Sequence, residues 1–218
     1  MSSHDTKLLI AEAFVSLFEK TPLQKISVSD IVDASGINRK TFYYHFEDKN
    51  YLITWLFRYD LGQMLLQNFP KDQLIYESKG DLKSFSQFPY YIFKKSGVRS
   101  LDHSGFFAVF TQCLDNRRFY YSNILRDNSR TSLYAYLSNL YLSAIREDIL
   151  FILSHRYLKE SSINFLSKFY SGAFLSFICS QIFLSSGEDI LESVGAFTNI
   201  IHTSIETQIK EQQLGRIH

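Results

Sequence analysis

One short segment, residues 27–49, constrains the fold of this chain more than any other. Its sequence, SVSDIVDASGINRKTFYYHFEDK, predicts a helix, a tight turn at glycine and a second short helix. Ser27 precedes Asp30 by three residues, a spacing that predicts reciprocal capping of the first helix. Gly36 stands where the chain must reverse, which often requires a positive φ, and Asn38 is expected to cap the second helix. This layout is typical of a helix-turn-helix that binds DNA.

The second helix of this motif divides into two faces. Ile37, Phe42 and Phe46 have the spacing of inward-packing residues, which leaves the polar side chains between them for solvent or a ligand. Arg39 and Lys40 lie at its start, where side chains reach guanine O6 and N7 in the major groove. The predicted DNA-contacting residues are Ser27, Asn38, Arg39, Lys40, Thr41, Tyr43, Tyr44, His45 and Lys49.

The same stretch resembles the DNA-binding domain of TetR-family transcriptional regulators. The resemblance rests on Ala-Ser-Gly at 34–36, on Thr-Phe-Tyr-Tyr-His-Phe at 41–46 and on Lys49, with one extra small residue between the alanine and the glycine. It covers about the first quarter of the chain. It implies a small DNA-binding domain on a larger all-helical body, with Tyr43 bonded to a DNA phosphate and Lys49 near the backbone. Contacts of that kind set register but carry little sequence information.

The charge of the chain alone would not suggest a nucleic-acid partner. The formal net charge is +1, and residues 1–50 contain six basic and seven acidic side chains. A dimeric regulator needs only a few positioned contacts in each half, so the motif outweighs the charge. We therefore expect weak non-specific affinity and a shallow dependence on salt, since that dependence counts neutralised phosphates.

Long segments with few breaks predict an all-α fold. The chain has only three prolines and nine glycines, with 45% hydrophobic residues, enough for a real core. We predict a helix-turn-helix DNA-binding domain at 1–48 and an all-helical regulatory and dimerisation domain at 49–218. Helices are expected at about 4–20, 49–68, 83–95 with a kink near Pro89, 104–116, 117–127, 129–157, 161–185 and 188–213, with loops at 71–82 and 96–102.

The two C-terminal segments predict a homodimer surface. Each is apolar over more than one face, and small residues recur at four-residue spacing in the first, which allows helices to approach closely. We expect them to pair with their symmetry mates in a four-helix bundle. The predicted interface residues are Phe169, Gly172, Ala173, Ser176, Phe183, Phe197 and Ile201.

A dense aromatic set in the middle of the chain has two interpretations. It either lines an apolar ligand pocket with tyrosine hydroxyls placed for recognition, or it is simply core. The candidate pocket residues are Tyr90, Phe93, Phe106, Phe110, Tyr120 and Phe174.

The body also resembles the C-terminal domain of regulators grouped with the dihydroxyacetone kinase activator. The matching stretches are Asn-Arg-Arg-Phe-Tyr at 116–120 and Phe-Tyr-Ser-Gly-Ala at 169–173. The chain departs from the pattern at 181–183, where it has Gln-Ile-Phe and such regulators often have an aromatic residue, commonly Trp, in the next helix. The adjacent Arg117 and Arg118 have two interpretations. They either bind an anion or a partner protein, or they are the solvated end of a helix.

Several functional classes find no support in the sequence. There is no nucleophile elbow, phosphate-binding glycine loop or metal-protease motif, so we expect no enzyme activity, cofactor or metal. Cys113 and Cys179 lie in apolar helical patterns, which argues against a disulfide. The polar N-terminus and the lack of a long apolar run predict a soluble, cytoplasmic protein without a membrane segment.

These features together predict a homodimeric, ligand-responsive transcriptional repressor. Its two recognition helices would enter successive major grooves of a pseudo-palindromic operator in double-stranded DNA, about 34–36 Å apart. A small-molecule effector would release the DNA by population shift. Two alternatives are a DNA-bound coactivator controlled by a partner protein, and an apolar-ligand carrier whose DNA-binding domain is vestigial.

Overall fold

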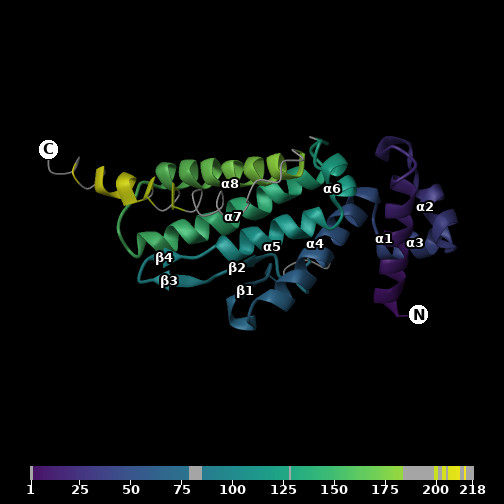
Figure 1. The fold of residues 1–218 in the computed structure, drawn as a ribbon, viewed down its shortest axis with the longest axis horizontal. Helices are drawn as coiled ribbons and strands as arrows, with labels where there is room; N and C mark the ends of the chain where they lie inside the picture. Colours follow the sequence, from purple (N-terminus) through teal and green to yellow (C-terminus); the bar gives the residue numbers. More distant parts are fainter. Residues whose placement is uncertain are drawn as a thin grey trace.

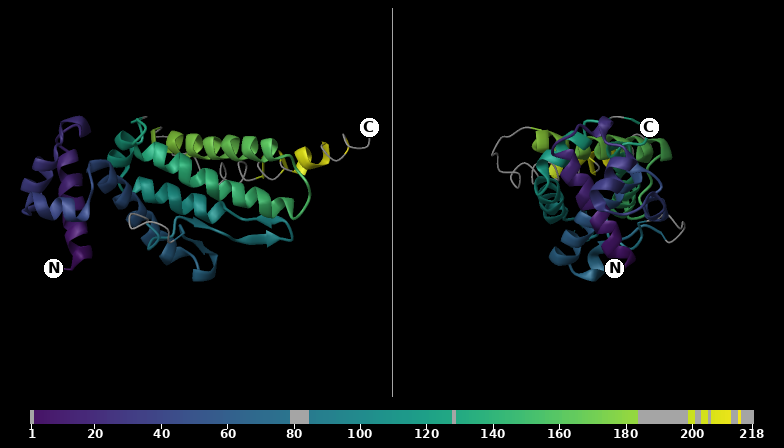
Figure 2. Two further views of the ribbon diagram at one scale, coloured as in Figure 1. Left: turned by 180° about the vertical axis from the view of Figure 1, so that it is seen from behind. Right: turned by 90° about the vertical axis from the view of Figure 1, so that its right-hand side faces the viewer.

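The protein consists of a small N-terminal helical domain at one end of an elongated helical body (Figure 1). The structure is a computed structural model that describes residues 2–78, 85–127, 129–183, 199–200, 203–204, 206–211 and 214. Helix α1 lies across the direction of the body helices (Figures 1 and 2). The first elements are α1 (Ser3–Phe18), η1 (Leu23–Lys25), α2 (Val28–Ser35), α3 (Arg39–His45) and α4 (Lys49–Asn68).

The core of the N-terminal domain forms where α1, α2 and α3 meet. Phe14 of α1 and Phe42 of α3 are completely buried, and Phe46 is nearly so. Ile31 supplies the inward face of α2. The predicted assignment of Phe42 and Phe46 to the core is therefore confirmed.

Helix α4 joins the two parts of the molecule. It leaves the N-terminal domain at Lys49 and runs for twenty residues into the body, with ten of them buried. Its predicted bounds agree with the observed ones. Trp55, the only tryptophan of the chain, lies at the junction, where its ring meets Phe46 of the N-terminal domain and Phe88 of the body.

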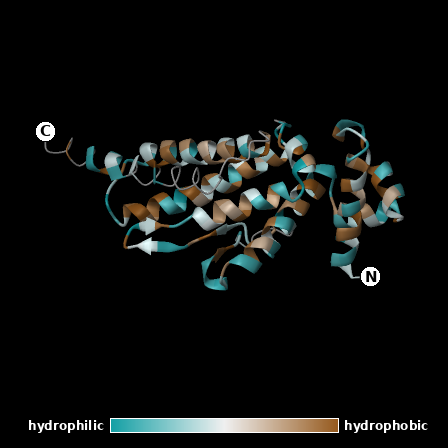
Figure 3. Ribbon diagram, viewed as in Figure 1, coloured by the Kyte–Doolittle hydropathy of each residue, from teal (hydrophilic) through white to brown (hydrophobic). Residues whose placement is uncertain are grey.

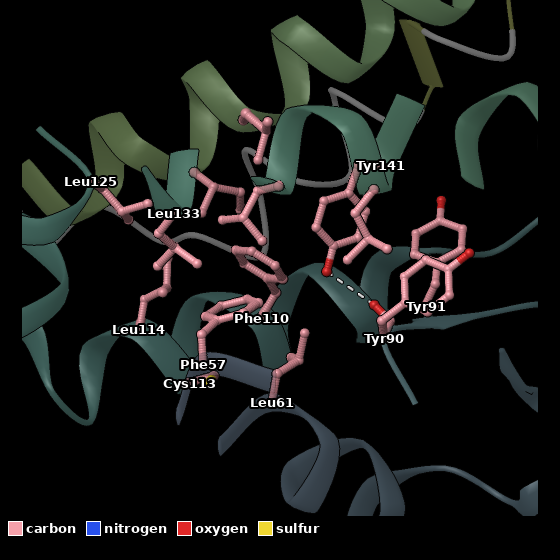
Figure 4. Close-up of a cluster of buried hydrophobic side chains, with 14 of the residues drawn as sticks. Phe57, Leu61, Tyr90, Tyr91, Phe110, Cys113, Leu114, Leu125, Leu133 and Tyr141 are labelled. Carbon is pink, nitrogen blue, oxygen red and sulfur yellow. Dashed lines mark hydrogen bonds between the residues drawn. The ribbon is translucent and has the colours of Figure 1, made fainter. Parts of the chain in front are cut away.

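The body packs three long helices and one short helix around aromatic side chains. Figure 4 shows Phe57, Phe110 and Tyr141 in this cluster, with the Tyr141 hydroxyl donating a 3.0 Å hydrogen bond to the carbonyl of Tyr90. Figure 3 shows the hydrophobic residues alternating with polar ones along these helices. The helices are α5 (Ser104–Asp115), α6 (Arg118–Ile124), α7 (Leu133–Leu153) and α8 (Glu160–Phe183). The all-α fold is thus confirmed, and α7 and α8 lie side by side (Figures 1 and 2).

The prediction of a helix at residues 83–95 is wrong. In its place the chain forms an extended segment whose strand β2 (Tyr91–Ile92) pairs antiparallel with β1 (Leu74–Ile75), which follows η2 (Lys71–Gln73). Pro89 disfavours a helical conformation at Phe88 and offers no amide hydrogen, and aromatic residues suit extended backbone. The predicted loop at 96–102 also contains a short pairing of β3 (Lys95–Gly97) with β4 (Ser100–Leu101).

Two further boundaries differ from expectation. The helix predicted at 129–157 is α7, which begins after its cap Ser132 and ends at Leu153, because Ser154 and His155 take positive φ values of 45° and 69°. Most of the helix predicted at 188–213 lies outside the described residues. None of the helices that the structure describes is long and apolar enough to cross a membrane.

Candidate nucleic-acid interface

Local capping builds the first helix of the helix-turn-helix. The Ser27 amide donates to the carboxylate of Asp30 at 2.7 Å, and the Asp30 amide donates back to the Ser27 hydroxyl at 3.3 Å. The Ser27 hydroxyl also donates to the Asp30 carboxylate at 2.7 Å; this bond, and then the bond from the Ser27 amide, lower the pKa of that carboxyl because they favour its charged form. Gly36 ends the helix with φ of 67°, and a Cβ there would meet no atom within 4 Å. Backbone freedom rather than space therefore requires glycine at the turn.

Helix α3 is fixed by its cap and by one buried ring. The Asn38 side-chain oxygen accepts hydrogen bonds from the Thr41 amide at 2.8 Å and the Thr41 hydroxyl at 3.0 Å. Phe42 holds the inner face in the core. Both caps predicted from the sequence are confirmed, although contact of Ser27, Asn38 and Thr41 with DNA stays a prediction.

The outer face of α3 presents cations and aromatic hydroxyls to solvent. Arg39 and Lys40 are exposed at its start, and Tyr43 and Tyr44 follow one turn later, exposed by 49% and 80%. The Arg39 guanidinium lies 5.8 Å from the centre of the Tyr43 ring, a cation–π contact that favours one orientation of the arginine. No acidic residue occurs within α3.

His45 and Lys7 border a hollow beside α3 of about 420 Å³. The Lys7 ammonium lies 5.8 Å from the Phe46 ring and 5.7 Å from the Trp55 ring. Burial, and then the nearby charge of Lys7, lower the pKa of His45, so the imidazole is biased toward its neutral form. Sequence reasoning missed Lys7 because it lies on a different helix from the motif.

Lys49 is used inside the protein. Its ammonium donates to the carbonyl oxygens of Leu23 at 2.7 Å and Ile26 at 2.9 Å, and burial lowers its pKa. These bonds tie the start of α4 to the segment that leads into α2. In this conformation Lys49 thus positions the motif, and its predicted contact with the DNA backbone is untested.

The positions of the acidic residues explain how a nearly neutral domain can present a basic helix. Asp5, Asp30 and Asp48 each cap a helix, where a negative charge offsets the positive end of the helix dipole. Glu12 is paired with Arg117 of the body. Four of the seven acidic side chains of residues 1–50 are therefore engaged away from the outer face of α3.

Comparison with known proteins agrees with this geometry. Residues 10–54 match the model of the family described as bacterial regulatory proteins, tetR family. A 63-residue stretch is 36% identical to the HTH-type dhaKLM operon transcriptional activator DhaS of Lactococcus lactis subsp. lactis (strain IL1403). That match covers 29% of this chain and 34% of DhaS, so it spans about a third of the relative.

The similarity of fold extends over nearly the whole chain. A solved structure of a dihydroxyacetone kinase operon activator DhaS aligns with a TM-score of 0.52 at 16% identity, covering 93% of this chain and 97% of the other. A TetR transcriptional regulator from Streptococcus agalactiae 2603V gives a TM-score of 0.55 at 16% identity, covering 91% and 94%. Residues 10–54 therefore match a TetR-family DNA-binding domain, and the chain as a whole shares its fold with these two solved regulators.

The aromatic residues predicted to line a pocket in the body are packed against one another. Phe106, Phe110 and Phe174 are almost completely buried, with ring centres 5.4–6.1 Å apart. Phe93 meets the ring of Phe151 edge-on at 4.9 Å. In this conformation these aromatic residues form part of the core, which was the second of the two interpretations of their spacing.

Two members of the predicted pocket set lie away from this aromatic cluster. Tyr90 lines an open pocket of about 450 Å³ next to Glu77 and Tyr136. Tyr120 is buried against Phe14 and Phe18 of α1, where its hydroxyl has no hydrogen-bond partner among the described residues. Tyr120 thus belongs to the contact between the body and the DNA-binding domain.

Part of the predicted dimer surface is exposed on α8. Phe169 is 56% exposed and stacks on Phe165, which is 65% exposed. Gly172 and Ser176 are exposed and Ala173 and Phe183 are partly buried. Phe197 and Ile201 lie outside the described residues. The surface therefore remains a prediction.

The structure gives Arg117 and Arg118 a role that sequence reasoning did not propose. Arg117 pairs with Glu12 of α1 and Asp60 of α4, while Arg118 pairs with Asp115 and reaches the carbonyl oxygens of Gln181 and Ile182 at 3.4 and 3.3 Å. Two adjacent arginines thus connect the DNA-binding domain and the end of α8.

Arg58 was also missed, although the sequence carried a signal for it. It is completely buried within an apolar stretch of α4, where its guanidinium bonds Glu77 at 2.5 Å and the Tyr136 hydroxyl at 2.6 Å. Charged side chains are almost never fully buried without a partner. An arginine inside an apolar stripe therefore predicts a buried ion pair.

Proposed function

We propose that this protein is a TetR-family regulator that acts as a homodimeric repressor, binds a pseudo-palindromic operator and responds to an effector. The observation that carries the proposal is the outer face of α3, which has exposed cations and tyrosine hydroxyls and no acidic residue. A short, capped helix with such a face suits insertion into the major groove.

The proposed roles follow from position on α3. Arg39 and Lys40, at the start of the helix, read base edges. Tyr43, Thr41 and His45 bind phosphates and set register, with Tyr44 at a phosphate or a thymine methyl group. Ser27, Asn38 and Lys49 complete the proposed interface, and their internal hydrogen bonds support a role in holding α2 and α3 in place.

The proposed division of labour places DNA binding in residues 1–48 and regulation and dimerisation in residues 49–218. The exposed rings of Phe165 and Phe169 support pairing through α8, because a dimer would remove this apolar surface from water. Gly172 and Ser176 on the same helix would let the partner approach closely.

Fluorescence anisotropy with the intergenic DNA beside the protein's own gene tests the proposal. We expect specific binding by the parent at two salt concentrations, with a shallow salt slope. Tyr43→Phe weakens binding to all sequences alike, because it removes a phosphate contact. Lys40→Ala relaxes sequence preference by about 1–3 kcal/mol at one base position. Absence of specific binding at low salt would refute the proposal that the protein acts as a repressor without a partner protein.

A second candidate function is a DNA-bound activator controlled by a partner protein. The observation that favours it is the similarity of the DNA-binding segment to DhaS, which is described as a transcriptional activator. Reporter expression separates the two: deletion of the gene raises expression from its operator for a repressor and lowers it for an activator. Comparison of the purified protein with and without cell extract then shows whether a second protein is required.

A further inference from the structure

A pocket between α4 and the α5–α6 junction lies next to the contact between the two domains. It has a volume of about 430 Å³. Its lining includes Tyr59, Asp60, Gln63, Gln67, Asn116 and Arg117. None of these residues belongs to the proposed DNA-binding face or to the predicted aromatic pocket.

The charges around the pocket do not balance. One guanidinium, that of Arg117, serves two carboxylates: it donates to Glu12 at 2.6 and 3.2 Å and to Asp60 Oδ2 at 3.1 Å. Two negative charges therefore share one positive charge. The pKa of Asp60 is raised, first by burial and also by Glu12, while Arg117 opposes the shift. The site as a whole favours an additional cation over an anion.

Asp60 has one oxygen with unused capacity. Its Oδ2 accepts from Arg117 and from the Tyr121 hydroxyl at 2.7 Å. Within the described part of the chain, Oδ1 accepts no hydrogen bond, and it is not among the fully buried atoms without a partner. Since Asp60 lines the pocket, that oxygen is available to a donor on a ligand.

Amide groups supply the remaining polar lining. Gln63 and Gln67 lie one turn apart on α4, so they share a face. Neither amide makes a hydrogen bond to another described residue. The Asn116 amide nitrogen has only the sulfur of Met64, 3.6 Å away. Amide oxygens and a carboxylate oxygen around one space form a set of acceptors.

We propose that this pocket binds a small primary amine in its ammonium form, with Asp60 as the counter-ion. An ammonium has three donors and one positive charge, which match the unused Asp60 oxygen, the amide oxygens and the missing positive charge. A carboxylate or phosphate ligand would instead add to the excess negative charge.

The position of Arg117 makes occupancy of the pocket a signal to the DNA-binding domain. An ammonium at Asp60 Oδ1 shares that carboxylate with Arg117, which also holds Glu12 of α1. A shift of α1 on the body that changes the Arg117–Asp60 contact would then change the affinity for the amine, which is the requirement for a population shift. This consequence rests on the DNA-binding function proposed above, whereas binding of the amine does not.

Trp55 gives a direct measure of binding. It is the only tryptophan, and its ring stacks on that of Tyr59 at 5.4 Å with an interplanar angle of 6°. Tyr59 lines the pocket. The full-length protein, without DNA and in phosphate buffer free of Tris, is titrated with ethanolamine and separately with ethylene glycol, at ionic strength matched with NaCl. We expect a saturable change in Trp55 emission with ethanolamine and none with ethylene glycol.

Matched variants locate the site. Asp60→Asn is expected to weaken ethanolamine binding at least tenfold, whereas Asp72→Asn, an exposed acid of η2, leaves it unchanged. A wild-type protein without a saturable response, or an Asp60→Asn protein that binds as well as the parent, overturns the proposal. If far-UV circular dichroism shows that Asp60→Asn does not fold, the double variant Gln63→Leu/Gln67→Leu is tested instead. We expect it to bind ethanolamine several-fold more weakly than the parent. Unchanged binding by this variant would overturn the site.

Repeating the DNA anisotropy measurement with ethanolamine separates the site from its consequence. A lower DNA affinity with ethanolamine, lost in Asp60→Asn, supports the link to the DNA-binding domain. Amine binding with unchanged DNA affinity leaves the site standing and overturns its role in regulation. Amine binding by a protein that binds no DNA refutes the proposed function but not the pocket.

Discussion

Helices α3 and α4 are close in sequence, but their cationic side chains are used in opposite ways. Helix α3 buries one side chain, Phe42, and turns its cations toward solvent. Helix α4 buries ten residues, including Arg58, whose charge is satisfied by Glu77, Tyr136 and backbone carbonyls. The contrast indicates that α3 keeps its cations for an external partner, whereas α4 uses its buried arginine to hold the body together.

Loss of Arg58 is the strongest way to test the second half of this comparison. Arg58→Met keeps length and apolar volume but leaves Glu77 and the carbonyl of Phe88 without their donor. Removing one member of a buried ion pair costs about 3–5 kcal/mol. Urea unfolding followed by circular dichroism measures the loss. A cost below about 1 kcal/mol would show that the network is not what anchors the body.

Alkaline pH is expected to act on the body and not on the recognition motif. Burial is the main cause that raises the pKa values of Tyr91, Tyr121 and Tyr141 well above normal, whereas both tyrosines of residues 1–48 are exposed. A tyrosine whose pKa is raised by folding contributes stability below the pKa of the unfolded chain, and this contribution falls as pH rises above it.

Each such tyrosine should lower the free energy of unfolding by about 1.4 kcal/mol per pH unit above about 10. Urea denaturation at several pH values, with tyrosinate absorbance at 295 nm as the probe, measures the slope. Tyr141→Phe, which removes one ionisable hydroxyl, serves as the control and should reduce that slope. A stability that stays flat through this range would contradict the burial of these hydroxyls.

Gly36→Ala tests how strongly the motif depends on local backbone geometry. Because φ is 67° and a Cβ would meet no neighbour, the cost is conformational and amounts to about 1–2 kcal/mol. Gly36→Asn should cost less, since asparagine tolerates this region better. Thermal unfolding of the two variants beside the parent gives the difference. Equal stability of Gly36→Ala and the parent would mean that the turn relaxes.

The motif was predictable from sequence because its determinants are local. The capping pair Ser27 and Asp30, the turn at Gly36 and the cap Asn38 act within three residues of their partners, so spacing alone reveals them. Their outcome agrees with expectation in each case.

The body was less predictable because its determinants are distant. Strand β2 depends on Ile75 and Tyr141, far from it in sequence, and an aromatic run without such partners fits a helix equally well. Arg117 contacts Glu12 across 105 residues, a pairing that no local pattern reveals. Of these distant contacts, only those of Arg58 could be expected from the sequence, because a charged residue within an apolar stripe predicts a buried ion pair.

The smallest expected change in stability comes from Arg39→Ala, on the exposed face of α3. Its contact with Tyr43 is an exposed cation–π pair, worth about 0.5–1 kcal/mol at most, and surface substitutions usually change stability by no more than about 0.5 kcal/mol. Urea unfolding should therefore barely distinguish the variant from the parent. The same substitution should reduce discrimination between operator variants by about 1–3 kcal/mol, because it removes a side chain that we propose reads a base edge.

Arg39→Lys separates charge from geometry at that position. It keeps the positive charge but not the planar fork that matches guanine, so it should retain non-specific affinity while losing most of the sequence preference. Anisotropy against a panel of single-base operator variants measures both quantities. If Arg39→Ala instead destabilised the fold by more than about 1 kcal/mol, α3 would depend on its outer face for stability. The contrast with α4 would then fail, because the recognition helix too would be using its polar groups internally.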